Sequence, residues 1–442
     1  MTGARVMNRI VAVCVGLGAV CAASAAEFSK DWKIVYSDRA SGADMGTESG
    51  LGRLAREIAE DLEEATGFKP PVIRQSQAAA GTRGLWLGAP AAKHAGFEFA
   101  DWTRMRNAYA ATNGSVYCFG NDRQGSKSMQ WSEVHRVLLP SGRAAMRFMR
   151  DVVGALYVMP GRTGAVVPKR EKIELADGAF RAEDPQVFFG SSRGSLSYSY
   201  ANADFPRGTF HDYGGHSFPA AVPKELFKDH PDYFAMNREG KRFAIPGRHS
   251  TPLCISNPEV QERVFLEAKK HFDDGADICQ VAQDDGDVRC FCPKCRELYG
   301  TGDDWGEKFW LFHRKLAERL EKACPGKLVY IMSYALTALP PKSFRKFPSN
   351  VMIQMCDYSP ASFDRWRSHE VPGGYLVYLY LWGNYPLPGY TPKRSFDALQ
   401  DLARLLRREN VRGVYRCGST GLEAIEGPQY YVFNRLLCDP DA

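Results

Sequence analysis

The chain has 442 residues, of which 44% are hydrophobic and 24% are charged, and its formal net charge is +6. This composition is ordinary for a globular protein and excludes disordered and fibrous classes. The small charge and the lack of a long basic run argue against nucleic acid as a partner. A chain of this length exceeds one ordinary core, so two domains are expected.

The first residues have the pattern of an export signal. Arg5 and Arg9 precede the apolar run IVAVCVGLGAVCAASA, which ends in small residues. This pattern predicts a signal peptide over residues 1–26, with cleavage after Ala25 or Ala26. The run is too short for a lasting anchor, and no other stretch is long enough to span a bilayer. The mature protein is therefore expected to be exported, periplasmic or secreted, with no membrane span.

Residues 27–175 are expected to form a small α/β accessory domain. Apolar residues recur at helical spacing in the first helix candidate, and Gly67 with two following prolines ends it. The strand candidates are 31–38, 84–90 and 115–121, and the helix candidates are 49–66 and 142–154.

Residues 176–442 alternate strands with helices, which predicts a parallel sheet with right-handed crossovers. The strand candidates are 186–190, 277–283, 328–334, 351–358, 375–382 and 412–418, and the helix candidates are 257–272, 305–324 and 395–410. An open doubly wound sheet fits this order, but a (β/α)8 TIM-type barrel is preferred because several strands end in polar or aromatic residues. Only six or seven strands can be counted, so the eighth is expected to be short and irregular or to lie beyond Ala442.

Several motifs resemble one protein family. They are GGHSF (214–218), HPDYFAMNREGKR (230–242), PLCISNPEV (252–260), QDDGDVRCFCPKC (283–295) and GPQYYVFNRLLCDP (427–440). Together they resemble domain-of-unknown-function family 4838, a bacterial family with a glycosidase-like barrel. The N-terminal segment resembles the α/β domain that precedes the barrel in α-glucuronidases and β-hexosaminidases. The resemblance implies a barrel of glycoside hydrolase type that acts on or binds carbohydrate.

Two adjacent acids are the strongest catalytic candidates. Asp284 and Asp285 follow an apolar run, and Gly286 permits the bend that would let both enter one pocket. Most glycosidases use two carboxyl groups, and repulsion between neighbouring acids raises one pKa toward a useful value. The pair also resembles that of substrate-assisted hexosaminidases, which implies that Asp284 orients the substrate and Asp285 is the acid. The alternative is that the acids cap a loop or bind a structural cation.

The partner acid could instead come from elsewhere. Glu423 and Glu426 follow the last strand candidate in a Gly-rich loop, and Asp357 ends the strand candidate 351–358. Each could equally be a solvated charge.

Further polar and aromatic residues are candidates for contact with a sugar. His216 lies in a loop with two glycines and could bind a hydroxyl group or transfer a proton. Trp382 at a strand end is the best candidate for stacking on a sugar ring, and a core ring is the alternative. The other candidates for a sugar subsite are His211, Tyr213, Tyr334 and Tyr385.

Cys290, Cys292 and Cys295 form a C-x-C-x2-C cluster, with Cys254 as a candidate fourth member. Four thiolates would suit a structural zinc ion. Because exported proteins usually pair their cysteines, a disulfide from Cys254 is an alternative, and free thiols are a third.

These features predict an exported glycoside hydrolase that cleaves a glycan, with an amino-sugar or uronic-acid glycoside as one option. Catalysis by carboxyl groups requires no cofactor, so a zinc ion would be structural. The alternative is a barrel protein that binds carbohydrate without cleaving it. A zinc-dependent hydrolase ranks last, because an all-cysteine site leaves no open metal position.

Overall fold

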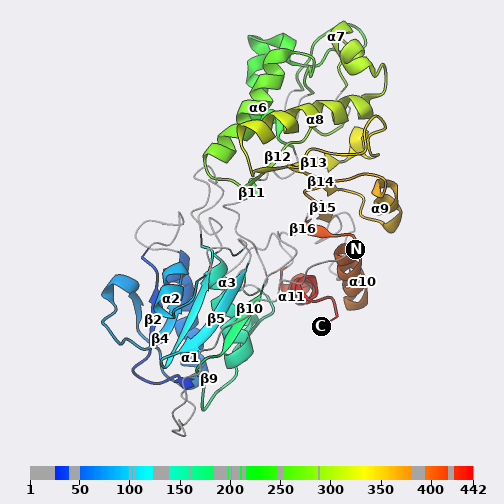
Figure 1. The fold of residues 1–442 in the computed structure, drawn as a ribbon. Coiled ribbons are helices and arrows are strands. Elements are labelled where there is room, and N and C mark those ends of the chain that lie inside the picture. Colours follow the sequence, from blue (N-terminus) through cyan, green and yellow to red (C-terminus); the bar gives the residue numbers. More distant parts are fainter. Residues whose placement is uncertain are drawn as a thin grey trace, which may run out of the picture.

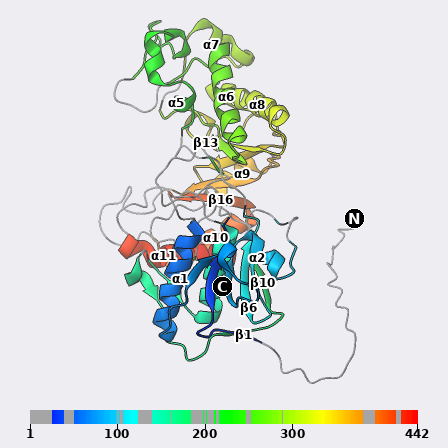
Figure 2. The ribbon, with the colours of Figure 1, turned by 90° about the vertical axis from the view of Figure 1, so that its left-hand side faces the viewer.

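The computed structural model describes residues 25–38, 50–98, 102, 106–122, 139–159, 161–183, 198, 201, 210–211, 216–245, 252–286, 289–379, 394–416 and 423–441. These residues contain two six-stranded sheets, one from the N-terminal part of the chain and one from the C-terminal part. Figures 1 and 2 show the N-terminal sheet below and the C-terminal sheet above, each with its own helices.

The N-terminal sheet has the strand order β10-β5-β6-β4-β2-β3. Its strands are β2 (Lys33–Tyr36), β3 (Val72–Arg74), β4 (Gly84–Leu87), β5 (Asn107–Thr112), β6 (Ser115–Gly120) and β10 (Phe180–Glu183). β5 pairs antiparallel with β6 and β10, whereas the pairs among β2, β3, β4 and β6 are parallel. Because β10 belongs to this sheet, the sheet extends beyond residue 175, where the accessory domain was predicted to end; the division into two domains stays a prediction.

The predicted N-terminal helices are both present. α1 (Gly50–Thr66) packs a fully buried apolar face that includes Leu54 and Ile58. α3 (Pro140–Phe148) continues as a π-helical turn, Met149–Val153, which ends at Gly154 with a φ of +85°. The smaller elements are α2 (Ala89–His94) and the short strands β1 (Ala25–Glu27), β7 (Leu156–Tyr157), β8 (Ala165–Val166) and β9 (Glu174–Ala176).

The C-terminal sheet is parallel throughout and runs β11-β12-β13-β14-β15-β16 in chain order. Its strands are β11 (Phe210–His211), β12 (Ile278–Gln280), β13 (Leu328–Ser333), β14 (Val351–Met355), β15 (Tyr375–Leu379) and β16 (Val411–Arg416). Five of the six strand candidates are confirmed, although β12 ends three residues before Gln283. The sixth candidate, 186–190, lies outside the described residues.

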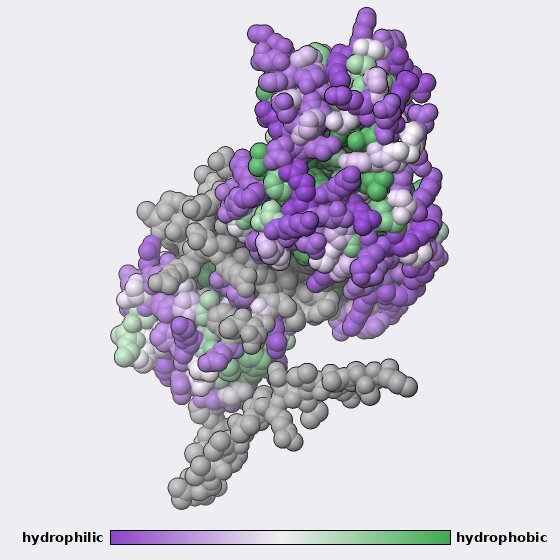
Figure 3. All heavy atoms as spheres, turned by 45° about the horizontal axis from the view of Figure 1, so that its top comes forward, coloured by the Kyte–Doolittle hydropathy of each residue, from purple (hydrophilic) through white to green (hydrophobic). Residues whose placement is uncertain are grey.

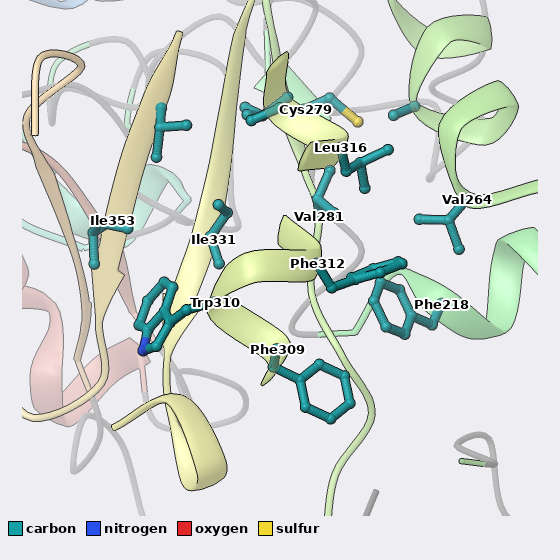
Figure 4. Close-up of a cluster of buried hydrophobic side chains, with 14 of the residues drawn as sticks. Phe218, Val264, Cys279, Val281, Phe309, Trp310, Phe312, Leu316, Ile331 and Ile353 are labelled. Carbon is teal, nitrogen blue, oxygen red and sulfur yellow. The ribbon is translucent and has the colours of Figure 1, made fainter. Parts of the chain in front are cut away.

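Helices pack against one face of this sheet, among them α6 (Pro258–Asp273), α8 (Trp305–Ala323) and α10 (Phe396–Arg408), which contact β12, β13 and β16. The other helices of this part of the chain are α5 (Phe218–Ala221), α7 (Pro293–Glu297), α9 (Pro360–Trp366) and α11 (Glu423–Cys438). Figure 4 shows Trp310 of α8 near Ile331 of β13 and Leu316 of α8 near Cys279 and Val281, with Phe312 beside Phe218. Alternate strand residues point to the opposite face, where Tyr330, Met352 and Leu376 form a small separate cluster.

Helices on one face of a parallel sheet, with side chains packed on the other, are the arrangement found in part of a (β/α)8 barrel. The described strands do not close: β11 and β16 are the two edges of the sheet. The observed architecture is therefore a six-stranded half-barrel, and complete closure stays a prediction.

The last helix joins the two parts of the molecule. Arg143 of α3 donates to both carboxylate oxygens of Glu183, at 2.9 and 3.2 Å, and also to Cys438 Sγ of α11 at 3.1 Å. Burial alone would raise the pKa of Glu183, but the guanidinium groups of Arg143 and Arg147 outweigh it and hold that pKa well below its usual range. Two cations on one nearly buried carboxylate thus fix α3 against β10 and touch α11.

The outer surface of the C-terminal part is mostly hydrophilic on the face that Figure 3 presents, with small apolar areas between charged residues. Scattered apolar residues of this kind are normal for a globular surface. Among the described residues, we find no helix that combines the length and the apolar character needed to cross a membrane.

Candidate active site

Three neighbouring segments meet at the carboxyl end of the parallel sheet. After β12, the chain continues alongside β13 through a hydrogen bond from Val281 N to Tyr330 O of 2.9 Å. On its other side, Ala282 N donates to Ser217 Oγ at 2.8 Å, and Ser217 N donates to Ala282 O at 3.2 Å. Residues 282–285 are therefore held between the segments that follow β11 and β13.

The two adjacent acids have opposite environments. The Asp284 residue is 1% exposed, whereas the Asp285 side chain is 57% exposed. Gly286 follows with a φ of +79°, a conformation that favours glycine, so the predicted bend is present. The chain thus delivers one carboxyl group into the protein and the next one to its surface.

Asp285 contacts one side chain from each flanking segment. The Tyr334 hydroxyl, from the turn after β13, donates to Asp285 Oδ1 at 2.9 Å. His216 Nε2 lies 3.5 Å from Asp285 Oδ2. These contacts bring together three residues that the sequence predicted for the site, and they orient the carboxyl group at the sheet edge.

The second ring nitrogen of His216 is also engaged. Nδ1 lies 2.7 Å from the Gln283 carbonyl oxygen, which only accepts, so this nitrogen carries a hydrogen. Nε2 is then the ring nitrogen that faces Asp285 Oδ2, where it can accept a hydrogen from the carboxyl group or from a ligand bound beside it.

A buried network of hydrogen bonds fixes the loop that carries Asp284 and Asp285. Gln283 Nε2 donates to Thr337 Oγ1 at 2.8 Å and to Tyr334 O at 3.3 Å, and Gln283 Oε1 accepts from His313 Nε2 at 3.0 Å. His313 is 1% exposed, and burial lowers its pKa from 6.5 to about 3. A permanently neutral imidazole therefore fixes the Gln283 side chain, whose own backbone carbonyl holds His216.

Asp357 serves a local structural purpose in the described structure. It lies beyond β14 with its side chain 60% exposed, and its carboxylate accepts from Ser359 N at 3.0 Å and from Arg365 Nη2 at 3.1 Å. Burial is the largest single influence on the pKa of Asp357 and raises it, but the hydrogen bonds from Ser359 and Arg365 and the charge of Arg365 together outweigh burial and lower that pKa. The role predicted for Asp357 in the site stays a prediction.

The remaining predicted site residues are described incompletely. His211 lies in β11, opposite Cys279 of β12, but its side chain is outside the described set. Glu423 and Glu426 lie in the first turns of α11, so the expectation that they belong to a loop is wrong, while their side chains are likewise not described. Tyr213, Trp382 and Tyr385 lie outside the described residues.

Several residues near the site were not predicted. Gln283, His313 and Thr337 carry no local sequence signal for a network, because their partners lie 30 or more residues away. Tyr378 and Tyr415 form a ring pair with centroids 4.6 Å apart on neighbouring strands β15 and β16. Their position on the strand face away from the helices could have been inferred from the two-residue period of each strand.

The four predicted cysteines form one buried cluster. The Sγ atoms of Cys254, Cys290, Cys292 and Cys295 all lie within 4.8 Å of one another. Cys254 Sγ is 3.7 Å from both Cys292 Sγ and Cys295 Sγ, far beyond the roughly 2.05 Å of a disulfide bond. The disulfide alternative is therefore wrong for the described structure, and the cluster consists of free cysteines.

This arrangement is suited to proton transfer at the edge of a sheet. Asp285 is accessible to a ligand and oriented by Tyr334, and His216 can exchange a proton beside it. The all-thiol cluster, by contrast, is buried and offers a metal no open position for a substrate.

The chain is similar to one protein family and to several known proteins. Residues 159–442 match the model of the family described as "Domain of unknown function (DUF4838)". Over 113 residues the chain is 32% identical to beta-galactosidase BgaA of Thermus sp.. The matched region covers 21% of this chain and 17% of that protein. A beta-galactosidase of Thermus thermophilus is 31% identical over 113 residues, with the same coverage. The chain thus spans about a sixth of the length of these relatives.

Solved structures with a similar outline include two glycosidases. The N-acetyl-beta-hexosaminidase of Streptomyces plicatus has a TM-score of 0.44 and 12% identity, over 93% of this chain and 86% of that one. A family 89 glycoside hydrolase from Clostridium perfringens has a TM-score of 0.47 and 9% identity, over 89% and 49% of the two chains.

Proposed function

The chain belongs to the DUF4838 family, and from the geometry of its acid pair we propose that it is a glycoside hydrolase that cleaves a glycan. The observation that carries this proposal is Asp285, an exposed carboxyl group at the carboxyl edge of a parallel sheet with Tyr334 and His216 on either side. Barrel enzymes place their chemistry at this edge. The partial identity to two β-galactosidases supports the same class of reaction.

In the proposed reaction, Asp285 is the general acid. It donates its proton to the glycosidic oxygen as the bond from that oxygen to the anomeric carbon breaks. Tyr334 fixes the plane of the carboxyl group, and His216 lies where it can return a proton or bind a substrate hydroxyl. Water then adds to the anomeric carbon, and the proton that the water loses returns to the Asp285 carboxylate, which completes hydrolysis and restores the acid.

Asp284 has two candidate roles in this scheme. It could orient a substrate acetamido group that acts as the nucleophile, as proposed from the resemblance of the acid pair to that of substrate-assisted hexosaminidases. Its burial under the loop equally suits an acid that positions Asp285, with Glu423 as the second carboxylate. A substrate that carries an amino sugar favours the first role, and a plain galactoside favours the second.

The proposal is tested by turnover of a panel of aryl glycosides that includes a β-galactoside and a β-N-acetylglucosaminide. We expect Asp285→Asn to lower kcat/KM by about 10²-fold or more on any glycoside that the wild type cleaves. Asp364→Asn, which changes an exposed carboxylate paired with Arg367, is the matched control and should leave turnover unchanged. Glycan binding without turnover, unaffected by Asp285→Asn, would instead favour a carbohydrate-binding protein without catalysis.

We also propose that the C-terminal sheet closes into a complete barrel and that the protein is exported. The one-sided helix layer and the cluster on the opposite strand face support the barrel. The signal-like pattern of residues 1–26 supports export. A periplasmic or secreted glycosidase would meet polymeric glycans outside the cytoplasm.

A further inference from the structure

We propose that Cys254, Cys290, Cys292 and Cys295 bind one structural zinc ion through four thiolates. All four residues are between 0% and 3% exposed, and their Sγ atoms gather within 4.8 Å. A tetrahedral zinc ion with Zn–S bonds of about 2.3 Å places its sulfur atoms about 3.8 Å apart. The two Sγ separations of 3.7 Å from Cys254 match this geometry closely.

Backbone donors already point at the sulfur atoms. Met236 N donates to Cys290 Sγ at 3.2 Å, and Cys295 N donates to Cys292 Sγ at 3.4 Å from within one turn. The Cys295 thiol itself donates to the Ser256 hydroxyl oxygen at 3.0 Å. Backbone donors such as Met236 N and Cys295 N stabilise negative charge on sulfur and orient the ligands toward a common centre.

Nearby cations balance the charge that a zinc tetrathiolate carries. Four thiolates and one Zn²⁺ leave a net charge of −2. Arg242 forms an isolated bridge with Met236, whose backbone N–H donates to Cys290 Sγ, and the fully buried Lys308 donates to the carbonyl oxygen of Arg296, the residue after Cys295. Lys308 donates to the carbonyl groups of Leu298 and Gly302 as well, so its position beside the cluster is fixed.

The segments that carry the ligands have little regular structure of their own. Isolated bridges link Phe234 with Leu253 and Met236 with Arg242, and α7 has only five residues. Segments of this type gain most from a metal cross-link. Because Cys290 follows Asp285 by only five positions, the ion would also anchor the loop that presents the proposed catalytic acid.

Metal analysis of the full-length protein tests this proposal independently of any enzymatic activity. Protein purified without added metal or a metal-binding tag should contain about one zinc ion per chain by elemental mass spectrometry. Cys292→Ser should lower this content to below about a tenth. Cys324→Ser, which changes a buried cysteine outside the cluster, is the matched control and should retain the zinc.

A second measurement covers the case in which Cys292→Ser fails to fold. Wild-type protein loaded with Co²⁺ in place of zinc should show the absorption bands of tetrahedral cobalt with thiolate ligands. Thiol titration under denaturing conditions with a chelator should find all four cluster cysteines reduced. Folded wild-type protein without metal, iron in place of zinc, or two fewer titratable thiols would each overturn the proposal.

Discussion

Acidification should destabilise this protein through one buried histidine. His313 is 1% exposed and lies among the rings of Phe218, Phe309 and Phe312, and burial lowers its pKa to about 3. In the unfolded chain its pKa returns to about 6.5. Between these two values the unfolded state binds the extra proton, so stability is complete above pH 6.5 and falls as the pH decreases toward 3.

The two pKa values set the size of the effect. At pH 5 the unfolded imidazole is almost fully protonated, whereas the folded one remains neutral. The difference corresponds to about 1.5 powers of ten in the unfolding equilibrium, or about 2 kcal/mol lost between pH 8 and pH 5. This loss is a large fraction of the stability of an ordinary domain.

Urea unfolding at pH 8 and pH 5 measures this loss. His313→Gln retains an N–H donor for Gln283 Oε1 but carries no titrating ring, so its stability should fall by about 2 kcal/mol less over the same pH interval. The variant should be less stable than wild type at both pH values, because the ring packing is lost. His94→Gln, which changes an exposed histidine, is the control and should follow the wild type. An identical pH dependence in wild type and His313→Gln would refute the reasoning.

Three further changes test other parts of the structure. Gln283→Leu leaves the His313 Nε2–H without its acceptor and should cost about 1–3 kcal/mol in urea unfolding, together with lower turnover of any aryl glycoside that the wild type cleaves. Glu183→Gln leaves two guanidinium groups without their carboxylate and should lower the free energy of unfolding by about 3 kcal/mol at pH 7. This difference from wild type should shrink as the pH falls below about 4.5. Glu174→Gln, which changes an exposed ion pair, is the control. N-terminal sequencing of the exported protein should find cleavage after Ala25, because cleavage one residue later would remove Ala26, which is 1% exposed in the N-terminal core. A mature N-terminus further inside the chain would contradict this expectation.

Elements with strong local signals were predictable from the sequence. Asn257 caps α6 by accepting from Glu259 N at 2.9 Å, and Pro258 occupies the first helical position, as the sequence indicated. β5 was missed because its sequence NAYAAT has few β-branched residues, although its pairing with β6 buries it almost completely. β10 was missed because FRAE is a charged, largely exposed edge strand, and the partners that hold it, β5 and the arginines that bind Glu183, lie far away in the sequence.

The candidate site was predictable where the chemistry is local. The acid pair, Gly286 and the cysteine spacing could be recognised within one short segment. The contacts of Asp285 with His216 and Tyr334 depended on which strands become neighbours, so the sequence supplied the residues but not their distances. Cys254 could be named as a fourth cysteine, yet only folding brings it within 3.7 Å of residues that follow it by about 40 positions.

The opposite environments of Asp284 and Asp285 restrict the catalytic role that each can have. A carboxyl group that is 1% exposed and one whose side chain is 57% exposed cannot be interchangeable, because only the exposed one is directly accessible to a substrate from solvent. The exposed acid is the one that can meet a glycosidic oxygen, so proton donation falls to Asp285. Asp284 then acts on the substrate only if a sugar substituent reaches past the surface, as an acetamido group would. The burial of Asp284 beside an exposed Asp285 thus connects the catalytic mechanism with the identity of the sugar. Comparing turnover of N-acetylated aryl glycosides with turnover of plain aryl glycosides tests both.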